Sequence, residues 1–539
     1  MQNFDYFGVL IDCSRNAVPS VEGLKRFLGT IAKMGYNMAM LYTEDTYEVE
    51  NEPYFGYKRG RYSMDEIREI DRFAASVGIE LVPCVQTLAH LASLKRWRAY
   101  RHKVFDIDDI LLVDEPRTYE LIENIFSTLE KTFTSRRVHI GMDEAHHIGL
   151  GKYLDTHGFT DRYSLLLKHL GKVCEIAKKH GFEHTMMAND LFFNISPGEF
   201  SSEEVRDFPE EITRSVPKNC GMVYWDYFAT NEARYDAMML STKKLSKESW
   251  FSGGAWTWGT FSPHNRYSIK RNETALKSCV KNGIRNVFFT LWGDDGGLCA
   301  YEAVLPALMH AISFANGVSE EEMKARFLRI TGERFDSLMD LDLPNYIFGE
   351  NVPVESPYFQ HSACNYCKIH LFDDPFLGTM SANLLPCDAS LMTEYAKRLH
   401  TRALESAKYS VLYEAMARLC DVLSVKLLLA KKTRAAYASG NKKELLSLAQ
   451  NDYTLCIKFT DEFYLAFRKQ WYAINKTYGF EIQDARLGGL VQRLKSCRER
   501  ILSYINGEIP EIAELEEEIL PMDDTYITSW AEIISANNA

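Results

Sequence analysis

One local pattern recurs along the first part of the chain and restricts its fold more than any other feature. An amphipathic helical segment ends near a glycine, and an apolar segment of strand length follows at once. Glycine readily adopts the left-handed backbone that closes a helix, so each occurrence predicts a helix followed by a buried strand. The pattern occurs at four glycines, Gly35, Gly78, Gly181 and Gly283.

Eight apolar segments of strand length occur before residue 300, with helical patterns between them. Near-continuous apolar strands that alternate with helices are typical of a parallel sheet covered on both faces. Eight such units predict the α/β class, as a closed (β/α)8 TIM barrel, and an open doubly wound sheet is the alternative. The predicted strands are Tyr6–Cys13, Tyr36–Thr43, Ile79–Gln86, Arg137–Asp143, His184–Asp190, Gly221–Phe228, Trp250–Trp256 and Asn286–Trp292.

The strand pattern fades after about residue 340, and long helical patterns replace it. We therefore predict a catalytic barrel over residues 1–335, a linker or docking segment over 336–385, and an all-α C-terminal domain over 386–539. The middle segment holds a lone CxxC, Cys364 and Cys367, flanked by His361 and His370. A spacing of three throughout is unusual for zinc, and a second CxxC is missing from the sequence, so packing is the favoured interpretation.

The overall charge limits the classes of partner. The formal net charge of −12 repels phosphate backbones and anionic membrane surfaces, and the only basic runs are short ones such as KRWR at Lys95–Arg98. The sequence has neither a signal-peptide pattern nor 18 consecutive apolar residues, and its 12 cysteines are scattered. We therefore expect a cytoplasmic protein with buried free thiols, with neither nucleic acid nor a membrane as partner, that acts on an uncharged substrate such as a sugar.

Polar and aromatic side chains gather where the predicted strands end. In a barrel, the carboxyl ends of all strands meet at one face, which carries the active site. Aromatic rings match the apolar faces of pyranose rings, while carboxylates and arginine match sugar hydroxyls. The segments at these ends are Asp12–Arg15, Thr43–Tyr47, Gln86–His90, Met142–His147, Ala188–Asp190, Tyr224–Tyr227, Trp256–Trp258 and Trp292–Asp295.

The segment HIGMDEAHH, residues 139–147, allows three interpretations. A DEAH-box helicase also needs a phosphate-binding G-x-x-x-x-G-K-[ST] motif, which the sequence lacks. His139, Asp143, His146 and His147 are zinc-ligand types, but the H-E-x-x-H spacing is absent. The third interpretation is an acid pair: at a strand end, Asp143 and Glu144 can both reach the pocket, one protonated and the other charged.

The stretch VHIGMDEAHH resembles the His-x-Gly-x-Asp-Glu signature of family 20 glycoside hydrolases, the β-N-acetylhexosaminidases. LIDCSRNAVP, PCVQTLAH and LWGDDG are similar to further segments of that family, and the whole chain most resembles the intracellular branch with a helical C-terminal domain. The sequence departs from the family at Met142, where the signature has a second glycine, and in MMAND, which lacks a tryptophan that many members carry.

The resemblance implies substrate-assisted hydrolysis without a metal or cofactor, in which the substrate's 2-acetamido oxygen attacks the anomeric carbon. It assigns Glu144 as general acid and base, Asp143 as the group that orients the acetamido N–H, and Tyr227 or Tyr224 as the donor to the acetamido oxygen. The other substrate-binding residues it implies are Arg15, His90, Trp225, Asp226, Trp256, Trp292 and Asp294.

The sequence therefore predicts an exo-acting β-N-acetylhexosaminidase that removes terminal β-linked GlcNAc or GalNAc from an oligosaccharide or glycoconjugate. A homodimer is compatible with it. Two alternatives stay open: another TIM-barrel retaining glycosidase with an enzyme carboxylate as nucleophile, and a carbohydrate-binding protein without catalysis.

Overall fold

The computed structural model describes residues 3–195, 201–354, 366–378, 388–520 and 529–537. His361 and Cys364 lie outside these residues. Contacts divide the chain into two compact units. Unit 1 contains residues 1–255, 268–292 and 307–323, and unit 2 contains residues 256–267, 293–306 and 324–539. The three-part division with boundaries at 335/336 and 385/386 stays a prediction.

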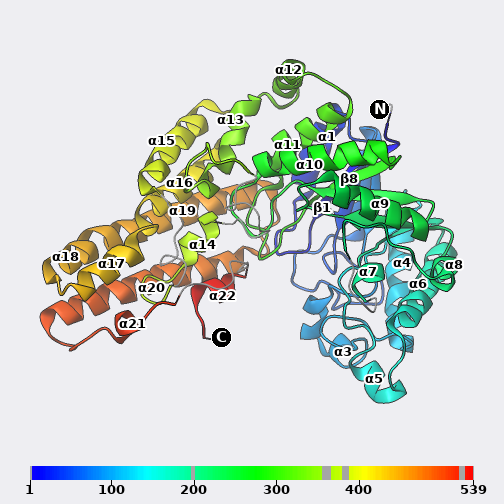
Figure 1. Cartoon of the computed structure of the whole chain (residues 1–539), viewed down its shortest axis with the longest axis horizontal. Coiled ribbons are helices and arrows are strands. Elements are labelled where there is room, and N and C mark those ends of the chain that lie inside the picture. Colours follow the sequence, from blue (N-terminus) through cyan, green and yellow to red (C-terminus); the bar gives the residue numbers. More distant parts are fainter. Residues whose placement is uncertain (1–2, 196–200, 355–365, 379–387, 521–528, 538–539) are drawn as a thin grey trace. The chain divides into compact units, whose positions relative to one another are not determined.

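Unit 1 is built on a closed barrel of eight parallel strands in sequence order, so the predicted (β/α)8 barrel is confirmed (Figure 1). Each strand pairs with its sequence neighbours, and β1 closes the ring against β8 through pairs such as Gly8 with Phe288. All eight predicted strands are present: β1 (Tyr6–Asp12), β2 (Met38–Tyr42), β3 (Glu80–Cys84), β4 (Arg137–His139), β5 (His184–Ala188), β6 (Cys220–Trp225), β7 (Ser249–Gly254) and β8 (Asn286–Leu291).

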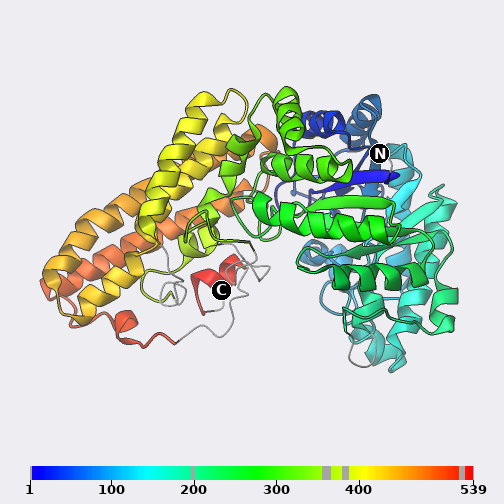
Figure 2. The ribbon, with the colours of Figure 1, turned by 45° about the horizontal axis from the view of Figure 1, so that its top comes forward.

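Helices and short helical turns connect the strands and surround the barrel (Figures 1 and 2). Alternation of strand and helix lets both faces of each strand be covered, which suits their apolar sequences. Up to β8 they are α1 (Val21–Met34), α2 (Met64–Ser76), η1 (Ala92–Arg96), α3 (Arg98–Arg101), α4 (Pro116–Thr132), α5 (Lys152–His157), α6 (Arg162–Lys179), α7 (Leu191–Asn194), α8 (Glu210–Ser215), α9 (Glu232–Leu245) and α10 (Asn265–Lys281).

The glycine pattern of the sequence has the predicted backbone geometry. Helix α1 ends at Gly35, whose φ of 111° is left-handed, and its N–H donates to the last-turn carbonyls of Ile31 and Ala32. Gly78, Gly181 and Gly283 also have positive φ. Each of these helices therefore stops where a side-chain-free residue permits it, and the following residues enter a buried strand.

The barrel interior is filled by side chains, not by an open channel. Alternate residues of the strands point inward, and in this barrel they form one buried apolar cluster. Its members are Leu10, Met38, Met40, Tyr42, Val82, Cys84, Met186, Val223, Trp250 and Phe288. The core closes the barrel below its carboxyl-end face, the face that carries the active site in barrels of this kind.

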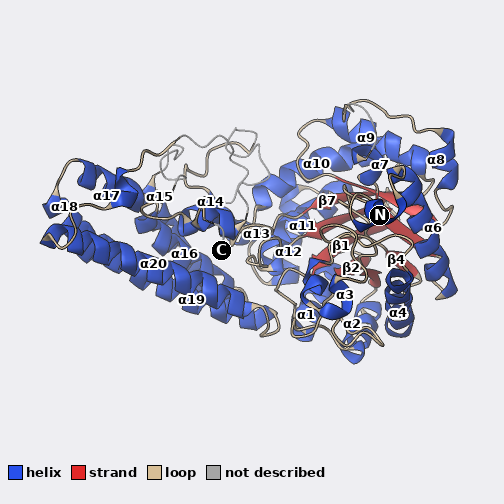
Figure 3. Cartoon of the chain, turned by 90° about the horizontal axis from the view of Figure 1, so that it is seen from below, coloured by secondary structure: helices blue, strands red, loops and turns tan. Residues whose placement is uncertain are grey.

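The chain after β8 is helical, as predicted, and Figure 3 shows its described parts as helices and loops. Among the described helices, none combines the length and the apolar character that a membrane span requires. The elements are η2 (Tyr301–Val304), α11 (Leu305–Ala315), α12 (Glu320–Thr331), α13 (Phe335–Met339), η3 (Asp340–Asn345), α14 (Tyr366–Phe372), α15 (Ala389–Glu405), α16 (Ser410–Lys426), α17 (Leu429–Ala438), α18 (Lys442–Ser447), η5 (Leu448–Asp452), α19 (Tyr453–Ile474), α20 (Phe480–Asn506), α21 (Ala513–Glu516) and α22 (Trp530–Ile534).

Candidate active site

The chain leaves the sheet early at β4, and this places the acid pair. β4 ends at His139, four residues before the predicted end of the strand. Gly141, Met142 and Glu144 then have φ values of 70°, 71° and 55°, in the left-handed region. Strand alternation no longer applies in this turn, so Asp143 and Glu144 are not forced to opposite faces. Left-handed backbone is uncommon for residues other than glycine and concentrates at functional sites.

Asp143 is held by two neighbours from the β3 loop. Gln86 Nε2 donates to Asp143 Oδ1 at 2.8 Å, and His90 Nε2 lies 3.1 Å from Asp143 Oδ2. Burial by itself raises the pKa of the Asp143 carboxyl, but the charge of His90 and these contacts hold it well below its usual range. Asp143 is therefore ionised at neutral pH, although only 19% of its side-chain surface is exposed.

His90 is the cation of this pair. Burial lowers the pKa of the imidazole, but the negative charge of Asp143 outweighs burial and raises the pKa to about 9. His90 Nε2 also lies 3.6 Å from Glu144 Oε2. One imidazolium therefore faces both members of the acid pair. His90 itself has a left-handed backbone, with φ of 58°.

The side chain of Glu144 is exposed to solvent, whereas its backbone N–H is hydrogen-bonded to a buried carboxylate. Half of its side-chain surface is exposed. Its backbone N–H donates to Asp190 Oδ2, at the end of β5, at 2.9 Å. Burial, and then the charge of Asp143, raise the pKa of Asp190 to about 7. Asp190 also bonds to the side chain of Trp225, so it connects the acid pair to the end of β6.

Arg15 stands on the other side of the site, after β1. Its Nη1 lies 3.1 Å from Asp12 Oδ2 and 3.4 Å from Glu44 Oε1. Its guanidinium also lies over two aromatic rings, 4.9 Å from the centroid of Tyr42 and 5.2 Å from that of Trp292. Burial raises the pKa of Glu44 to about 7, and Arg15 opposes that increase.

Aromatic side chains complete the ring of residues. Trp225 stacks on Tyr227 with centroids 5.4 Å apart and an interplanar angle of 23°. The Trp292 Nε1–H donates to the Tyr227 hydroxyl at 3.0 Å, and Trp292 meets Tyr42 edge to face. The Tyr42 hydroxyl in turn accepts from Gln86 Nε2 at 3.0 Å, which leads back to Asp143.

The structure thus brings together seven of the residues expected from the sequence. They share one connected set of contacts within unit 1, at the carboxyl ends of β1, β3, β4, β6 and β8: Arg15, His90, Asp143, Glu144, Trp225, Tyr227 and Trp292.

Tyr224 and Asp226 do not join this set. The Tyr224 hydroxyl donates to Asp226 Oδ2 at 2.9 Å, and the same oxygen accepts from Arg234 Nε, on α9, at 2.8 Å. Because residues alternate along a strand, Tyr224 and Asp226 point to the helix side while Trp225 and Tyr227 point to the site. Tyr224 and Asp226 thus tie β6 to its covering helix.

Trp256 and Asp294 belong to unit 2. Trp256 is buried and stacks on Trp258 with centroids 4.0 Å apart, and its Nε1–H donates to the Trp258 carbonyl at 2.9 Å. Asp294 is partly exposed, and its carbonyl accepts from the Gly259 N–H at 3.0 Å. Their contact with a substrate stays a prediction.

Sequence reasoning did not single out Asp12, Gln86 or Asp190, all of which contact members of the set. The signal was present, because each is a polar residue at the carboxyl end of a predicted strand. Asp12 contacts Arg15 on its own loop, whereas the sequence does not reveal the partners of Gln86 and Asp190, which lie on the loop after β4.

The histidines of HIGMDEAHH do not act together. Burial lowers the pKa of His139 to about 4, and its neutral Nδ1 accepts the Gly141 N–H at 3.1 Å. His147 is exposed and pairs with Asp108 at 3.1 Å. In the part of the chain that the structure describes, no three metal-binding side chains lie close enough together to hold an ion.

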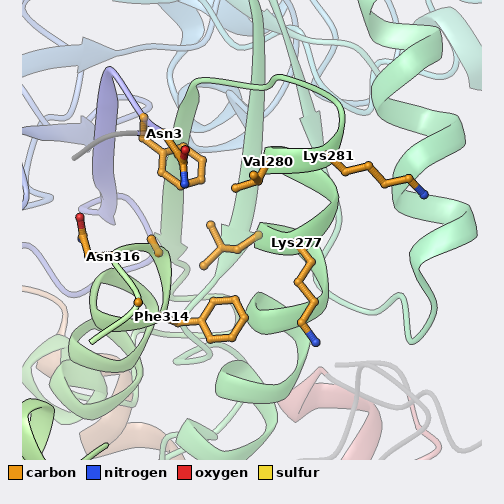
Figure 4. A pocket seen from close by; sticks show the side chains of 10 residues that line it. Asn3, Lys277, Val280, Lys281, Phe314 and Asn316 are labelled. Atoms are coloured by element: carbon orange, nitrogen blue, oxygen red, sulfur yellow. The ribbon is translucent and has the colours of Figure 1, made fainter. Parts of the chain in front are cut away.

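A separate hollow of about 610 Å³ lies at the opposite end of the barrel (Figure 4). Its walls come from the residues before β1 and from the ends of α10 and α11, among them Phe4, Lys277, Val280 and Phe314. None of the site residues lines it.

The site combines a fixed anion, a neighbouring exposed carboxyl, one arginine and a wall of aromatic rings. An ionised Asp143 beside Glu144 can orient and stabilise a group that becomes positive, while Glu144 exchanges a proton with a ligand. Aromatic rings and Arg15 supply the surfaces and donors that a sugar ring requires.

Two family models match the chain. The model described as glycosyl hydrolase family 20, catalytic domain, matches residues 4–250. The model described as glycoside hydrolase 20C C-terminal domain matches residues 336–534.

Individual relatives are distant. Hexosaminidase D from Bos taurus is 22% identical over 281 residues, which cover 50% of this chain and 75% of that protein. Hexosaminidase D from Homo sapiens is 26% identical over 223 residues, 40% of this chain and 43% of that protein. The solved structure of a family 20 exo-β-N-acetylglucosaminidase from Vibrio harveyi aligns with a TM-score of 0.46 and 15% identity, over 63% of this chain and 58% of that chain.

Gly141→Ala tests the turn that carries the acid pair. A Cβ at Gly141 would lie 2.1 Å from Gln86 Oε1, in addition to the left-handed φ. We expect a loss of unfolding free energy above about 2 kcal/mol. The matched control is Gly78→Ala, where φ is also left-handed but nothing lies within 4 Å of the added Cβ, and we expect about 1 kcal/mol there. Equal losses in urea unfolding would contradict the close contact with Gln86.

The raised pKa of His90 predicts a pH-dependent stability. Protonated His90 stabilises the fold fully below its unfolded pKa of 6.5, and this contribution disappears as the pH rises through about 9. The contribution is on the order of 3 kcal/mol. The unfolding temperature of the wild type should therefore fall between pH 6.5 and 9 by more than that of His90→Asn. Parallel pH profiles of the two proteins would show that His90 is neutral in the folded state.

Proposed function

The chain belongs to glycosyl hydrolase family 20, and we propose that it is an exo-β-N-acetylhexosaminidase that releases terminal β-linked GlcNAc or GalNAc. The observation that carries this proposal is the environment of the acid pair. Asp143 stays charged between His90 and Gln86, while Glu144, the next residue, is open to a ligand. Substrate-assisted cleavage requires one carboxyl that is held ionised beside a second carboxyl that transfers a proton.

In the proposed first step, the substrate's acetamido oxygen attacks the anomeric carbon and the glycosidic bond breaks. Glu144 gives its proton to the departing oxygen, and the sugar becomes an oxazolinium ion. In the second step, Glu144 takes a proton from water, whose oxygen attacks the same carbon and reopens the ring. The two displacements restore the β configuration and the protonated Glu144, so the reaction needs no cofactor.

Asp143 acts on the acetamido nitrogen. Its carboxylate accepts the N–H of that group and stabilises the positive charge that forms there, which orients the attacking oxygen. His90 keeps Asp143 ionised, and its Nε2 also lies 3.6 Å from Glu144 Oε2.

Sugar binding is assigned to the residues opposite the acid pair. Arg15 donates to ring hydroxyls, and its carboxylate neighbours Asp12 and Glu44 fix its direction. Trp292 and Trp225 present ring faces to the pyranose and to the acetamido methyl group. The Tyr227 hydroxyl accepts from Trp292 Nε1–H, and we assign it as the donor to the acetamido oxygen. Asp294 and Trp256 stay candidates for further contacts with the sugar.

The compartment is proposed from the cysteines. All ten described cysteines are free, and nine of them are buried. Unpaired thiols in this number favour a reducing compartment, so we propose the cytoplasm.

Replacement of each acid tests the division of labour. Glu144→Gln should lower kcat on β-GlcNAc glycosides with poor leaving groups by ~10²–10⁴-fold, because the general acid is lost. Asp143→Asn should lower kcat for substrates that carry the acetamido group, since an amide does not stabilise the positive nitrogen. Rates are measured with p-nitrophenyl and alkyl β-GlcNAc, with circular dichroism as the control for folding. Wild-type rates in both variants would refute the proposal.

The two alternatives give different results in the same assay. An enzyme with its own carboxylate as nucleophile would cleave β-GlcNAc and resist a thiazoline mimic of the oxazolinium ion. A binding protein would retain GlcNAc on an affinity column and hydrolyse none of the glycosides.

Tyr227→Phe and Tyr224→Phe form a matched pair. The first removes the hydroxyl that faces the site, and the second removes one that faces α9. We expect Tyr227→Phe to lower kcat/KM for p-nitrophenyl β-GlcNAc at least about 10-fold, the value of one hydrogen bond to a developing charge. Tyr224→Phe should instead lower the unfolding temperature, with kcat/KM within about 2-fold of the wild type. The reverse pattern would move the acetamido contact to Tyr224.

A further inference from the structure

A cluster of exposed aromatic rings lies on the loops that follow β2 and β3. Tyr54 stacks on Trp97 with centroids 5.4 Å apart and an interplanar angle of 28°. Tyr57 meets Trp97 edge to face, also at 5.4 Å. Tyr54 and Tyr57 expose 46% and 42% of their surface. Two large rings held in fixed orientation and left open to water are unusual on a surface, and they mark a place where a ligand can stack.

These loops belong to the carboxyl-end face of the barrel, the face of the proposed active site. The β2 loop also carries Glu44, and the β3 loop also carries His90, both of which contact site residues. Figure 1 shows α3, which begins directly after Trp97, and α5, from the loop after β4, on the same side of unit 1.

The β2 loop is folded back toward the sugar-binding arginine. A Cβ at Gly56 would lie 1.9 Å from the Asp45 carbonyl, so the segment with Tyr54 and Tyr57 packs directly on the residue after Glu44. Arg59 pairs with Asp45 at 3.0 Å and also donates to the Ser14 carbonyl, next to Arg15. The aromatic cluster is therefore fixed beside the sugar-binding residues.

Cations surround the rings. Lys58 lies over the Tyr57 ring at 5.6 Å, and Arg96 lies over the Trp97 ring at 5.6 Å. Arg101 donates to the carbonyls of Lys95 and Arg96 and so fixes the backbone of this segment. The short basic run that sequence analysis noted, KRWR, thus brackets Trp97.

Three carboxylates of the β2 loop form ion pairs with other cations. Glu50 pairs with Lys131, Glu52 with Arg117 and Asp45 with Arg59. Within the described ranges, no carboxylate lies within ion-pair distance of the four cations next to the rings, Lys58, Lys95, Arg96 and Arg98. The chain has a net charge of −12, so carboxylates are in excess, yet none in the described part of the chain is paired with these four cations. Their positive field can therefore act on a negatively charged ligand.

We propose that Tyr54, Tyr57 and Trp97, together with Lys58, Arg96 and Arg98, form a platform that binds the aglycone of the substrate, and that this aglycone carries an acidic sugar. The rings stack on the pyranose that follows the cleaved N-acetylhexosamine, and the cations pair with its carboxylate or sulfate. This inference rests on the proposed hydrolase function. It specifies that the neutral terminal sugar is attached to a second sugar that carries a negative charge.

The test compares oligosaccharides in matched pairs. Each has terminal β-GlcNAc attached to a glucuronic acid, and its partner is the same compound with the carboxyl reduced to the alcohol; a third series carries a sulfated neutral sugar. The p-nitrophenyl glycoside, whose aglycone is a single ring, reports on the sugar pocket alone. We expect a wild-type kcat/KM at least about 5-fold higher for the acidic partner of a pair, and a smaller ratio in high salt.

Two double variants separate charge from stacking. Arg96→Gln with Arg98→Gln should bring the acidic-to-reduced ratio to about 1. Tyr54→Ala with Tyr57→Ala should lower kcat/KM for both partners, relative to the p-nitrophenyl glycoside, by about 5- to 10-fold. The matched controls are Arg72→Gln and Tyr478→Ala, exposed residues outside these loops, which should leave both quantities at the wild-type value.

The outcomes are distinguishable. If the p-nitrophenyl glycoside is cleaved but neither the carboxylate nor the sulfate series is preferred over its neutral partner, the platform is refuted and the hydrolase function stands. The same holds if the preference exists and both double variants keep it, because another surface then binds the acidic sugar. If no β-GlcNAc glycoside is cleaved, the proposed function itself has failed.

Discussion

The site depends on keeping a carboxylate charged where little water reaches it. Asp143 is largely buried, and burial alone would drive it to its neutral form. A cation from the next strand loop, His90, and an amide donor, Gln86, reverse this effect. Burial opposes the charged form of both groups, and each charge stabilises the other: the carboxylate of Asp143 keeps His90 protonated, and the imidazolium keeps Asp143 ionised. The structure therefore couples three features: the charge on Asp143, the proton on His90 and the orientation of the pair.

The backbone around this pair is shaped for the same purpose. Glu44, His90, Met142 and Glu144 all have left-handed φ, although none is glycine. Each is at or next to the point where a strand loop turns into the site. Such conformations persist only where surrounding contacts hold them, and here Asp190 holds the Glu144 N–H while Gln86 Oε1 accepts the Met142 N–H at 3.2 Å. Met142 shows that the position where the family signature has a second glycine does require a left-handed residue.

The barrel face divides into an aromatic and cationic side and an acidic side. Arg15, Trp292 and Tyr227 line one side, and the acid pair with His90 lines the other. The strands hold these groups at fixed distances from one another, and the loops after the strands supply further side chains to the same face. The long β2 and β3 loops add both the residues that tune the acid pair and an exposed set of rings and cations. The same two loops therefore carry Glu44 and His90, which contact Arg15 and the acid pair, and the proposed platform for the aglycone.

The sequence determined the barrel, its eight strands, the helices that end at glycines, and the acid pair with Arg15, Trp225, Tyr227 and Trp292 as candidates. These follow from local patterns, namely apolar runs, glycine positions and polar residues at strand ends. Only the tertiary structure decided which side of β6 faces the site. The sequence alone does not distinguish Tyr224 from Tyr227, because the register of the strand decides which of them points inward. It also decided that Gln86 and Asp190 serve Asp143 and Glu144, since those contacts join residues 57 and 46 positions apart. Such pairings arise because neighbouring parallel strands bring their carboxyl-end loops together, and no local pattern in the chain encodes them.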